Sequence, residues 1–209
     1  MLVGSLLVAG FAMSAIGGGV AYGSAGYRGE FWKLALDDKL DHVHGHRRGW
    51  WWLSIGQLIG LVVLTGGFVG LVSLESDAGQ SVLAHVSLGV YLVALIAWMI
   101  GLTFQTMTIP RAATQRADSG STPDWIHAFW DAGYLGEAIW VIAANLAYLV
   151  IGIAILRSGQ VASWAGWVAV ALGGGIPVAV VATRQGFPEL SQLVPFALGI
   201  SLIIEALRR

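Results

Sequence analysis

The chain has no cysteine and few charged residues. Of its 209 residues, 11% are Asp, Glu, Lys or Arg, less than half of the roughly 25% typical of a soluble domain. The absence of cysteine excludes disulfides, thiolate metal sites, iron–sulfur clusters and cysteine nucleophiles. The net charge of −1 gives no basic surface for nucleic acid. With 56% hydrophobic residues, ten Trp and 29 Gly, the composition is typical of an all-α, polytopic membrane protein.

Chemistry that depends on particular motifs is also missing. No lysine lies in an apolar segment, which disfavours a retinal linkage, and there is neither a G-x-S-x-G nor an H-E-x-x-H sequence. No basic residue precedes the first apolar run, so the usual start of a cleaved signal peptide is missing. We therefore interpret that run as a retained membrane span.

Apolar segments of spanning length predict about six transmembrane helices in a single membrane domain, residues 1–209. They cover residues 2–23, 51–74, 82–108, 123–156, 161–183 and 190–207. The third is expected to end at Pro110 and Arg111, followed by a polar loop. The fourth, about 34 residues or roughly 51 Å long, exceeds the hydrocarbon core and should overhang on the cytoplasmic side.

Residues 28–43 are too charged to span. On a helical wheel Asp37 and Asp41 lie on one side, and Leu36 and Leu40 on the other. This pattern predicts an amphipathic interfacial helix between the first two spans. Placing the N-terminus outside puts eight of the eleven basic residues on the cytoplasmic side, as the positive-inside tendency requires. We expect a bacterial inner-membrane protein in that orientation.

Polar residues succeed one another along the start of the fourth segment at spacings of three, four, three and three. They are Asp124, His127, Asp131, Tyr134 and Glu137. On a helix they form a slowly turning stripe. Because intramembrane carboxyls are costly, Glu137 is a candidate for binding a proton or a solute, with Gln105 or Gln57 as its candidate neighbours. The alternative is a wetted helix end with a His127–Asp131 pair.

Histidines raise two further possibilities. A zinc, iron or manganese site could use His42, His44 and His46 together with His127 and Asp131. The alternative is that the histidine-rich stretch is a solvated linker. For haem, only His85 lies within a span, so a single haem would need an unusual second ligand.

Small residues mark candidate packing surfaces. Gly56 and Gly60 form one G-x-x-x-G pattern, and Gly66 and Gly70 form another, which favours close helix–helix approach. The triple glycine at residues 173–175 (Gly173, Gly174 and Gly175) is followed by Pro177 and predicts a bend. Asn145 is interpreted as an interhelical hydrogen-bonding residue.

The C-terminal third carries a family resemblance. Its sequence GIAILRSG at residues 152–159, then WAGW at 164–167 and the glycine-rich fifth span, resembles small uncharacterised six-helix bacterial membrane proteins. The resemblance implies a six-helix topology and supplies no activity.

Three functions are compatible with these features, in order of preference. The first is a non-catalytic accessory or scaffold subunit that contacts the bilayer and packs against other membrane subunits or copies of itself. The second is a small-solute transporter or channel that uses Glu137. The third is a redox subunit that holds a metal or a single haem.

Overall fold

The computed structural model describes residues 1–24, 34–183 and 188–208; within these ranges the side chains of residues 15–24, 134, 188 and 189 are not described. The described residues form helices joined by short turns, with no strand. The α-helices are α1 (Leu2–Ser24), α2 (Leu36–Gly45), α3 (Arg47–Glu75), α4 (Ser81–Thr103), α5 (Ile109–Ser119), α6 (Trp125–Ser158), α7 (Ser163–Thr183), α8 (Pro188–Ser191) and α9 (Leu193–Arg208). Two π-helical segments, η2 (Ser76–Gln80) and η3 (Phe104–Thr108), flank α4.

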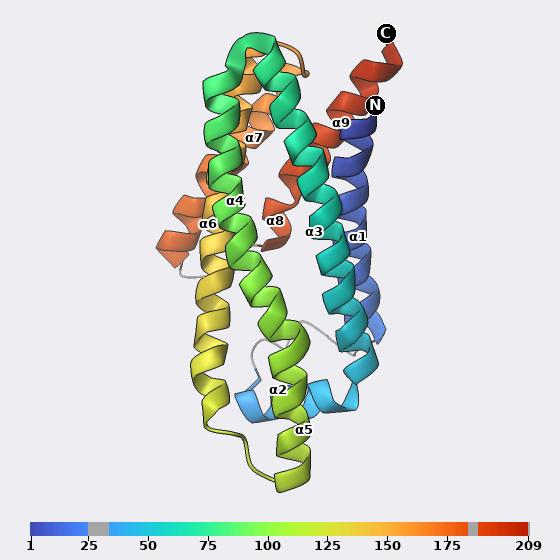
Figure 1. The fold of residues 1–209 in the computed structure, drawn as a ribbon, viewed down its shortest axis with the longest axis vertical. Helices are drawn as coiled ribbons and strands as arrows, with labels where there is room; N and C mark the ends of the chain where they lie inside the picture. Colours follow the sequence, from blue (N-terminus) through green and yellow to red (C-terminus); the bar gives the residue numbers. More distant parts are fainter. Residues whose placement is uncertain (25–33, 184–187, 209) are drawn as a thin grey trace.

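The long helices run alternately down and up the molecule (Figure 1). In that view α1 descends from the N-terminus, α2 lies across the lower end, α3 ascends, and α4 descends into α5. Helix α6 then ascends, α7 turns back, and α9 brings the C-terminus to the upper end near the N-terminus. The main packing pairs are α1 with α3, α4 with α6, α6 with α7, and α1 with α9.

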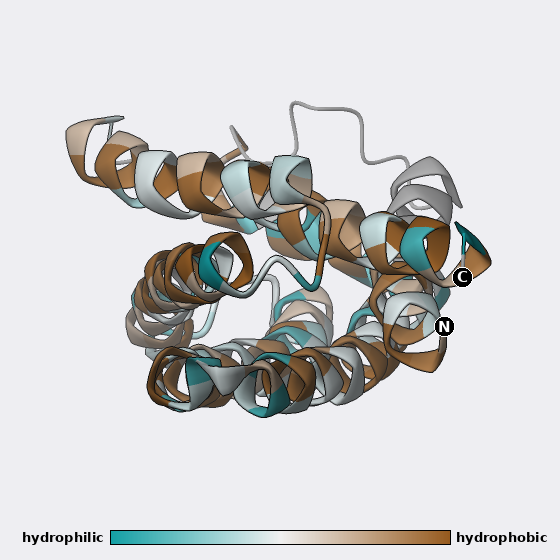
Figure 2. Cartoon of the chain, turned by 90° about the horizontal axis from the view of Figure 1, so that it is seen from above, coloured by the Kyte–Doolittle hydropathy of each residue, from teal (hydrophilic) through white to brown (hydrophobic). Residues whose placement is uncertain are grey.

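Three helical runs are long and apolar enough to cross a membrane: Arg47–Ser119, Trp125–Ser158 and Ser163–Thr183. The first contains two antiparallel legs, because it turns at Gly79, whose φ of 86° suits glycine. Among shorter helices, the described part of α1 up to Ser14 is also apolar. Hydrophobic residues occur on all sides of most helices (Figure 2), as in helices that lie in an apolar environment.

The third apolar segment does not end at Pro110, so the expectation of a loop over residues 111–119 is wrong. In η3 the backbone N–H of Ile109 donates to the carbonyl of Phe104, five residues back, and Pro110 then lies in the first turn of α5. Proline is tolerated in a first turn because its missing N–H has no partner to lose there. The helix ends at Gly120, whose φ is 74°.

The helix at the lower end begins later than expected. We predicted an interfacial helix over residues 28–43, whereas α2 covers Leu36–Gly45, and residues 28–33 lie outside the described residues. Leu40 and Val43 are fully buried, and Lys39 is buried beside them. Leu40 and Val43 pack against Ala112 and Ala113 of α5 and Ile126 of α6, so apolar contacts join α2 to the bundle.

Helices occur near the other expected segments, while the count of six membrane spans stays a prediction. Helix α6 has the expected 34 residues, displaced by two residues from the predicted 123–156. Pro177 lies inside α7. Pro195 falls in the first turn of α9, where it does not interrupt the helix.

Candidate functional site

A hollow opens between α3, α4, η3, α5 and α6 toward the lower end of the bundle. Its enclosed cavity volume is about 80 Å³, and the space widens into an open mouth. We call this space the lower hollow. It is lined by Trp50, Trp98, Gly101, Phe104, Gln105, Thr108, Ile109, Ile126, Phe129, Trp130, Gly133 and Glu137.

Helix α6 turns only part of the predicted polar stripe toward this hollow. Each step of three residues falls about 60° short of a full turn, so the stripe rotates around the helix along its length. Asp124, His127 and Asp131 are exposed, whereas Glu137 is half-buried and lines the lower hollow. The Tyr134 side chain lies outside the described residues.

The inward face of α6 is formed by different residues from those of the stripe. Ile126, Trp130, Gly133 and Glu137 all line the lower hollow, at spacings of four, three and four that keep them on one helical face. Gln105, one of the two residues expected near Glu137, lines the same hollow. The sequence singled out Glu137 and Gln105, and both line the hollow; their role stays a prediction, and the sequence did not indicate which face of α6 points inward.

The π-helical segment η3 forms one wall of the lower hollow. It contributes Phe104, Gln105 and Thr108. The Trp50 indole N–H donates to the backbone carbonyl of Gln105 at 2.5 Å, which links α3 to this wall. Since a π-helical turn displaces carbonyls from their usual α-helical partners, it can supply acceptors to side chains, and such turns occur often at functional sites.

Aromatic pairs hold the walls apart. Trp98 stacks on Trp140 with 4.5 Å between ring centroids, and Phe104 meets Phe129 at 5.2 Å across the space between η3 and α6. Phe129 also makes an edge contact with Trp125. Large rings at a helix crossing keep the backbones separated, because each must be accommodated between them.

The lower end is closed by a polar clamp between α2 and α5. The Arg116 guanidinium donates to both carboxylate oxygens of Asp41, at 2.7 and 3.0 Å, and contacts Asp37 at 3.1 Å. Thr122, just before α6, donates to Asp37 at 2.6 Å and accepts from Arg116. The hydrogen bonds from Arg116 lower the pKa of the Asp41 carboxyl.

Lys39 lies on the bundle side of α2. Its ammonium is 5.2 Å from the centroid of the Trp130 ring, a cation–π distance. Burial lowers the pKa of Lys39, because desolvation disfavours its charged form.

A second, inner hollow lies in the middle of the bundle, and its volume of about 20 Å³ is enough for about one water molecule. It is lined by Ser14, Gln57, Leu61, Leu64, Tyr91, Trp98, Trp140, Tyr148 and Gln192. Trp98 lines both hollows, so its ring, held by Trp140, lies between them. The Gln57 side-chain carbonyl is buried here and accepts no hydrogen bond from the described residues, and the inner hollow thus has a free polar acceptor.

Asn145 makes the expected interhelical contact. Its side-chain amide donates to the Ser191 hydroxyl of α8 at 2.6 Å and to the Val141 carbonyl within α6 at 2.7 Å. Both side chains are buried. The interpretation of Asn145 as a residue that joins helices is confirmed.

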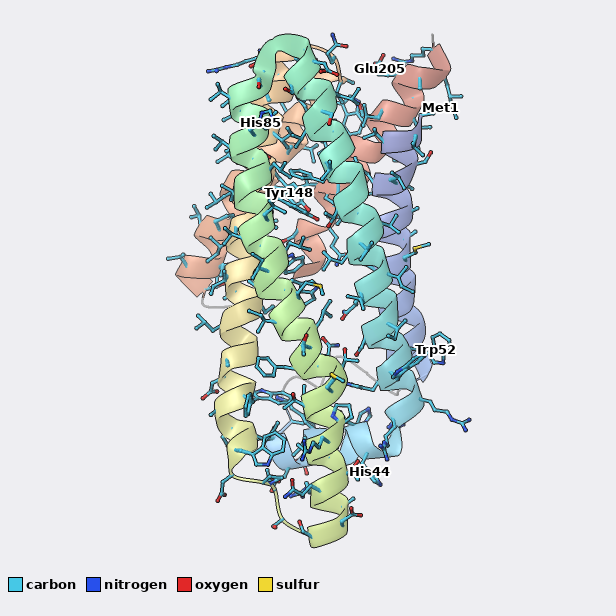
Figure 3. All side chains as sticks on the ribbon, in the orientation of Figure 1. Met1, His44, Trp52, His85, Tyr148 and Glu205 are labelled. Carbon is cyan, nitrogen blue, oxygen red and sulfur yellow. The ribbon has the colours of Figure 1, made fainter. Side chains whose placement is uncertain are left out.

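The residues considered for a metal are not gathered into a ligand set. Within the described ranges, no three His, Cys, Asp or Glu side chains come together as a metal site. His42 and His46 stack at 4.3 Å, and the His46 Nδ1 lies 2.9 Å from the His42 carbonyl, as successive turns of one chain bring them together. Figure 3 shows His44 on α2 at the lower end.

His85, the candidate haem ligand, is exposed near the upper end of α4 (Figure 3). Its Nδ1 lies 2.7 Å from the Ser81 carbonyl and 3.2 Å from the Ser81 hydroxyl, both in the preceding turn of its own helix. Exposure on an outer face gives no enclosed haem pocket, so the structure supplies no support for haem ligation there.

The predicted packing glycines divide into two groups. At Gly60, Gly70 and Gly173 an added Cβ would come within 3.0 Å of atoms of a neighbouring helix. At Gly66 and Gly175 it would meet nothing within 4 Å, and at Gly174 it would meet only a Leu149 methyl group at 4.0 Å. Gly56 is half-buried.

The contact expected of Gly66 is made by Gly67, which approaches the Leu7 backbone. The reason is helical periodicity. Gly67 comes seven residues, two full turns, after Gly60, whereas Gly66 is rotated about 100° from that face. A G-x-x-x-G pattern alone therefore does not reveal which glycine meets the neighbouring helix.

Compared with models of known protein families, with curated proteins and with solved structures, the chain matches none. The resemblance of its C-terminal third to six-helix bacterial membrane proteins therefore stays a prediction.

Sequence reasoning missed most of the lower hollow's walls. Trp50 and Trp98, neither of which the sequence indicates as a site residue, both line the hollow. A usable signal was the spacing of Ile126, Trp130 and Gly133 with Glu137, since these residues share one helical face. No sequence signal indicated η3.

Proposed function

We propose that the chain is an integral membrane protein that binds a small solute in the lower hollow and carries it, with Glu137 as the binding acid. The observation that supports this most strongly is the composition of the lining: a hollow walled by aromatic side chains, with one carboxyl group among them. Convergence of an apolar pocket and a few polar groups is the usual mark of a ligand site.

Membrane integration is supported by the outer surface. Val82, Ile96 and Val181 are 77%, 63% and 73% exposed, and they lie on helical runs apolar enough to cross a bilayer. Apolar side chains so exposed are costly in water but suit lipid. We propose about six spans with the N-terminus outside, in a bacterial inner membrane, with α2 lying in the cytoplasmic interface.

The place of the inner hollow adds weight to a carrier. Because Trp98 lines both hollows, we propose that movement of its ring lets the solute pass from the lower hollow toward the middle of the bundle, as a carrier requires.

A hollow-filling substitution tests the proposal. A Cβ added at Gly133 would meet no atom within 4 Å, and Gly133 lines the lower hollow, so Gly133→Leu should fold and occupy the space. Gly89→Leu is the matched control, since Gly89 is equally open and does not line the hollow.

The readout is native mass spectrometry of protein purified from its own membranes, followed by uptake of the retained solute into proteoliposomes. Wild type and Gly89→Leu should retain and transport it, and Gly133→Leu should do neither. Retention and transport by a folded Gly133→Leu variant would show that the lower hollow is not the site.

An accessory or scaffold subunit is a second candidate. Gly66 and Gly175 are exposed and open, and small residues on a lipid-facing side allow another helix to approach closely. Gly66→Leu and Gly175→Leu should then weaken co-purification of a partner or a second copy. A monomer that binds no partner in native membranes would rule this candidate out.

A further inference from the structure

The geometry of the lower hollow also indicates the class of its ligand, on the assumption that the hollow is the site we propose. We infer that it takes an organic cation with an alkylated ammonium group, held between the aromatic rings and the Glu137 carboxylate. This inference names the chemistry of the solute, which the proposed function leaves open.

The charge of the lining favours a cationic ligand. Among the twelve described residues that line the hollow, Glu137 is the one ionisable residue, and the others are aromatic, aliphatic, glycine, Thr or Gln. A charge moved out of water into such a space needs an opposite charge beside it. A cation receives that partner from Glu137, whereas an anion would meet a like charge.

The aromatic side chains of the lining also favour a cationic ligand. Trp50, Trp98, Phe104, Phe129 and Trp130 are five of the twelve lining residues. The face of an aromatic ring carries partial negative charge, which attracts cations and repels anions, and tryptophan does so most strongly. This wall already has one cation beside it, since the Lys39 ammonium lies over Trp130.

The nearby basic groups do not reverse this preference. Lys39 does not line the hollow, and its ammonium lies over the Trp130 ring. Arg116 lies at the lower end, where its guanidinium contacts Asp37, Asp41 and Thr122. Neither group is placed to bind an anion within the aromatic space.

The composition of the lining also favours an alkylated ammonium group over a primary one. A primary ammonium brings three N–H donors that must all be satisfied when buried. Only three of the twelve lining residues, Thr108, Gln105 and Glu137, have side-chain acceptors, whereas five are aromatic, so most of the lining presents ring faces or aliphatic groups to a ligand. An alkylated ammonium group has fewer N–H donors that need acceptors, and it presents methyl groups to the aromatic rings.

Two sources could supply this chemistry: a free organic cation or the headgroup of a lipid. The hollow is lined by η3 and by the first turns of α6, which lie toward the end of the bundle where α2 crosses (Figure 1), at the level that we expect to be the headgroup region. The experiment therefore begins in nanodiscs of phosphatidylglycerol, whose headgroup has no ammonium, and is repeated in nanodiscs of phosphatidylcholine.

The probes are choline, its uncharged isostere 3,3-dimethylbutan-1-ol, and ethanolamine, each titrated calorimetrically into the full-length protein with empty nanodiscs subtracted. Choline should bind at least about tenfold more tightly than the isostere, as expected for a desolvated cation–π and carboxylate site. It should also bind more tightly than ethanolamine. This comparison needs no variant, so a folding defect cannot obscure it.

Two variants then test whether Glu137 causes the preference for choline over its uncharged isostere. Glu137→Gln should reduce the choline-to-isostere ratio to near one, while Asp131→Asn, which removes an exposed carboxylate of the same helix, should leave it unchanged. A ratio retained in folded Glu137→Gln protein would overturn the role of Glu137.

The two proposals fail in different ways. If wild type binds the isostere as tightly as choline, and Gly133→Leu abolishes both, the cation inference falls while the hollow stands. If no probe binds, or if Gly133→Leu binds as wild type does, the proposed site falls as well. Ethanolamine binding as tightly as choline would overturn the alkylated class. Weaker choline binding in phosphatidylcholine would indicate a lipid headgroup as the source, and unchanged binding a free cation.

Discussion

The two halves of α6 show how residue size decides between close packing and an open space. In the upper half, Val141, Ala147 and Ile151 are fully buried, and Gly173 of α7 approaches so closely that an added Cβ would lie 2.5 Å from the Leu149 backbone nitrogen. In the lower half, Trp130 lines a hollow instead.

The same helix thus serves two purposes with two residue classes. Small residues let backbones touch, so dispersion contacts are dense and the position of each helix is strongly determined. Large rings hold backbones apart and leave room that a ligand can use. The difference predicts that the upper half determines stability and the lower half determines binding.

The largest expected effect tests the closely packed half. Gly173→Val would place side-chain atoms against the Leu149 nitrogen and the Asn145 carbonyl oxygen, 2.5 and 2.6 Å from the new Cβ. Because both are backbone atoms, α6 and α7 must separate, and we expect a loss on the order of 3 kcal/mol. The measurement is thermal unfolding in detergent.

Gly175→Val is the control for that substitution. It lies in the same triple glycine, yet an added Cβ there meets nothing within 4 Å, so its effect should be small. Equal losses at the two positions would show that glycine in this stretch matters for helix conformation and not for contact, and the contrast between the halves of α6 would lose its basis.

A second test concerns the clamp beneath the lower hollow and depends on pH. The Arg116 hydrogen bonds hold the pKa of Asp41 below its ordinary value of 3.8. Since the folded pKa is the lower one, the stabilisation is fully present above about pH 4 and is lost as pH falls through the folded pKa. Acidification should therefore release α2 from α5.

Spin labels can monitor this release, because the chain has no cysteine and any introduced pair is unique. Labels at Asp38 and Asp118, both exposed, should give a narrow distance distribution at pH 7 that broadens below pH 4. Asp41→Asn should broaden it already at pH 7, while Asp124→Asn should not. A narrow distribution in Asp41→Asn would mean that apolar packing alone anchors α2.

Composition and residue spacing are sufficient to predict part of this structure. The length of α6 and the interhelical role of Asn145 could be predicted, because apolar length and a lone buried amide each have one physical consequence in a membrane protein. Glu137 could be singled out as a candidate because a carboxyl group within an apolar segment is costly to bury and is seldom present without a functional role.

The features that the sequence could not predict depend on neighbours distant in the chain. The polar stripe of α6 rotates, and only the packing partners decide which part faces inward. Similarly, Gly60 and Gly66 look equivalent in sequence, but α1 lies against only one of them. The π-helical segment η3 before Pro110 depends on hydrogen-bond register, which residue type does not determine.

The smallest expected effect lies in the wall of the lower hollow. Trp50 is 2% exposed, and its indole N–H donates to the Gln105 carbonyl within η3. Trp50→Phe keeps most of the ring and removes the donor, so the loss should be about 1 kcal/mol, the net worth of one hydrogen bond. Trp52→Phe is the control, because Trp52 is 64% exposed.

Thermal unfolding measures the loss of stability in each variant. Hydrogen exchange at Ile109, whose N–H donates to the Phe104 carbonyl, should accelerate only in Trp50→Phe if the bond from Trp50 to Gln105 holds the π-helical turn. Unchanged exchange in both variants would mean that η3 is maintained by its own helix, and that the wall of the hollow is rigid without α3.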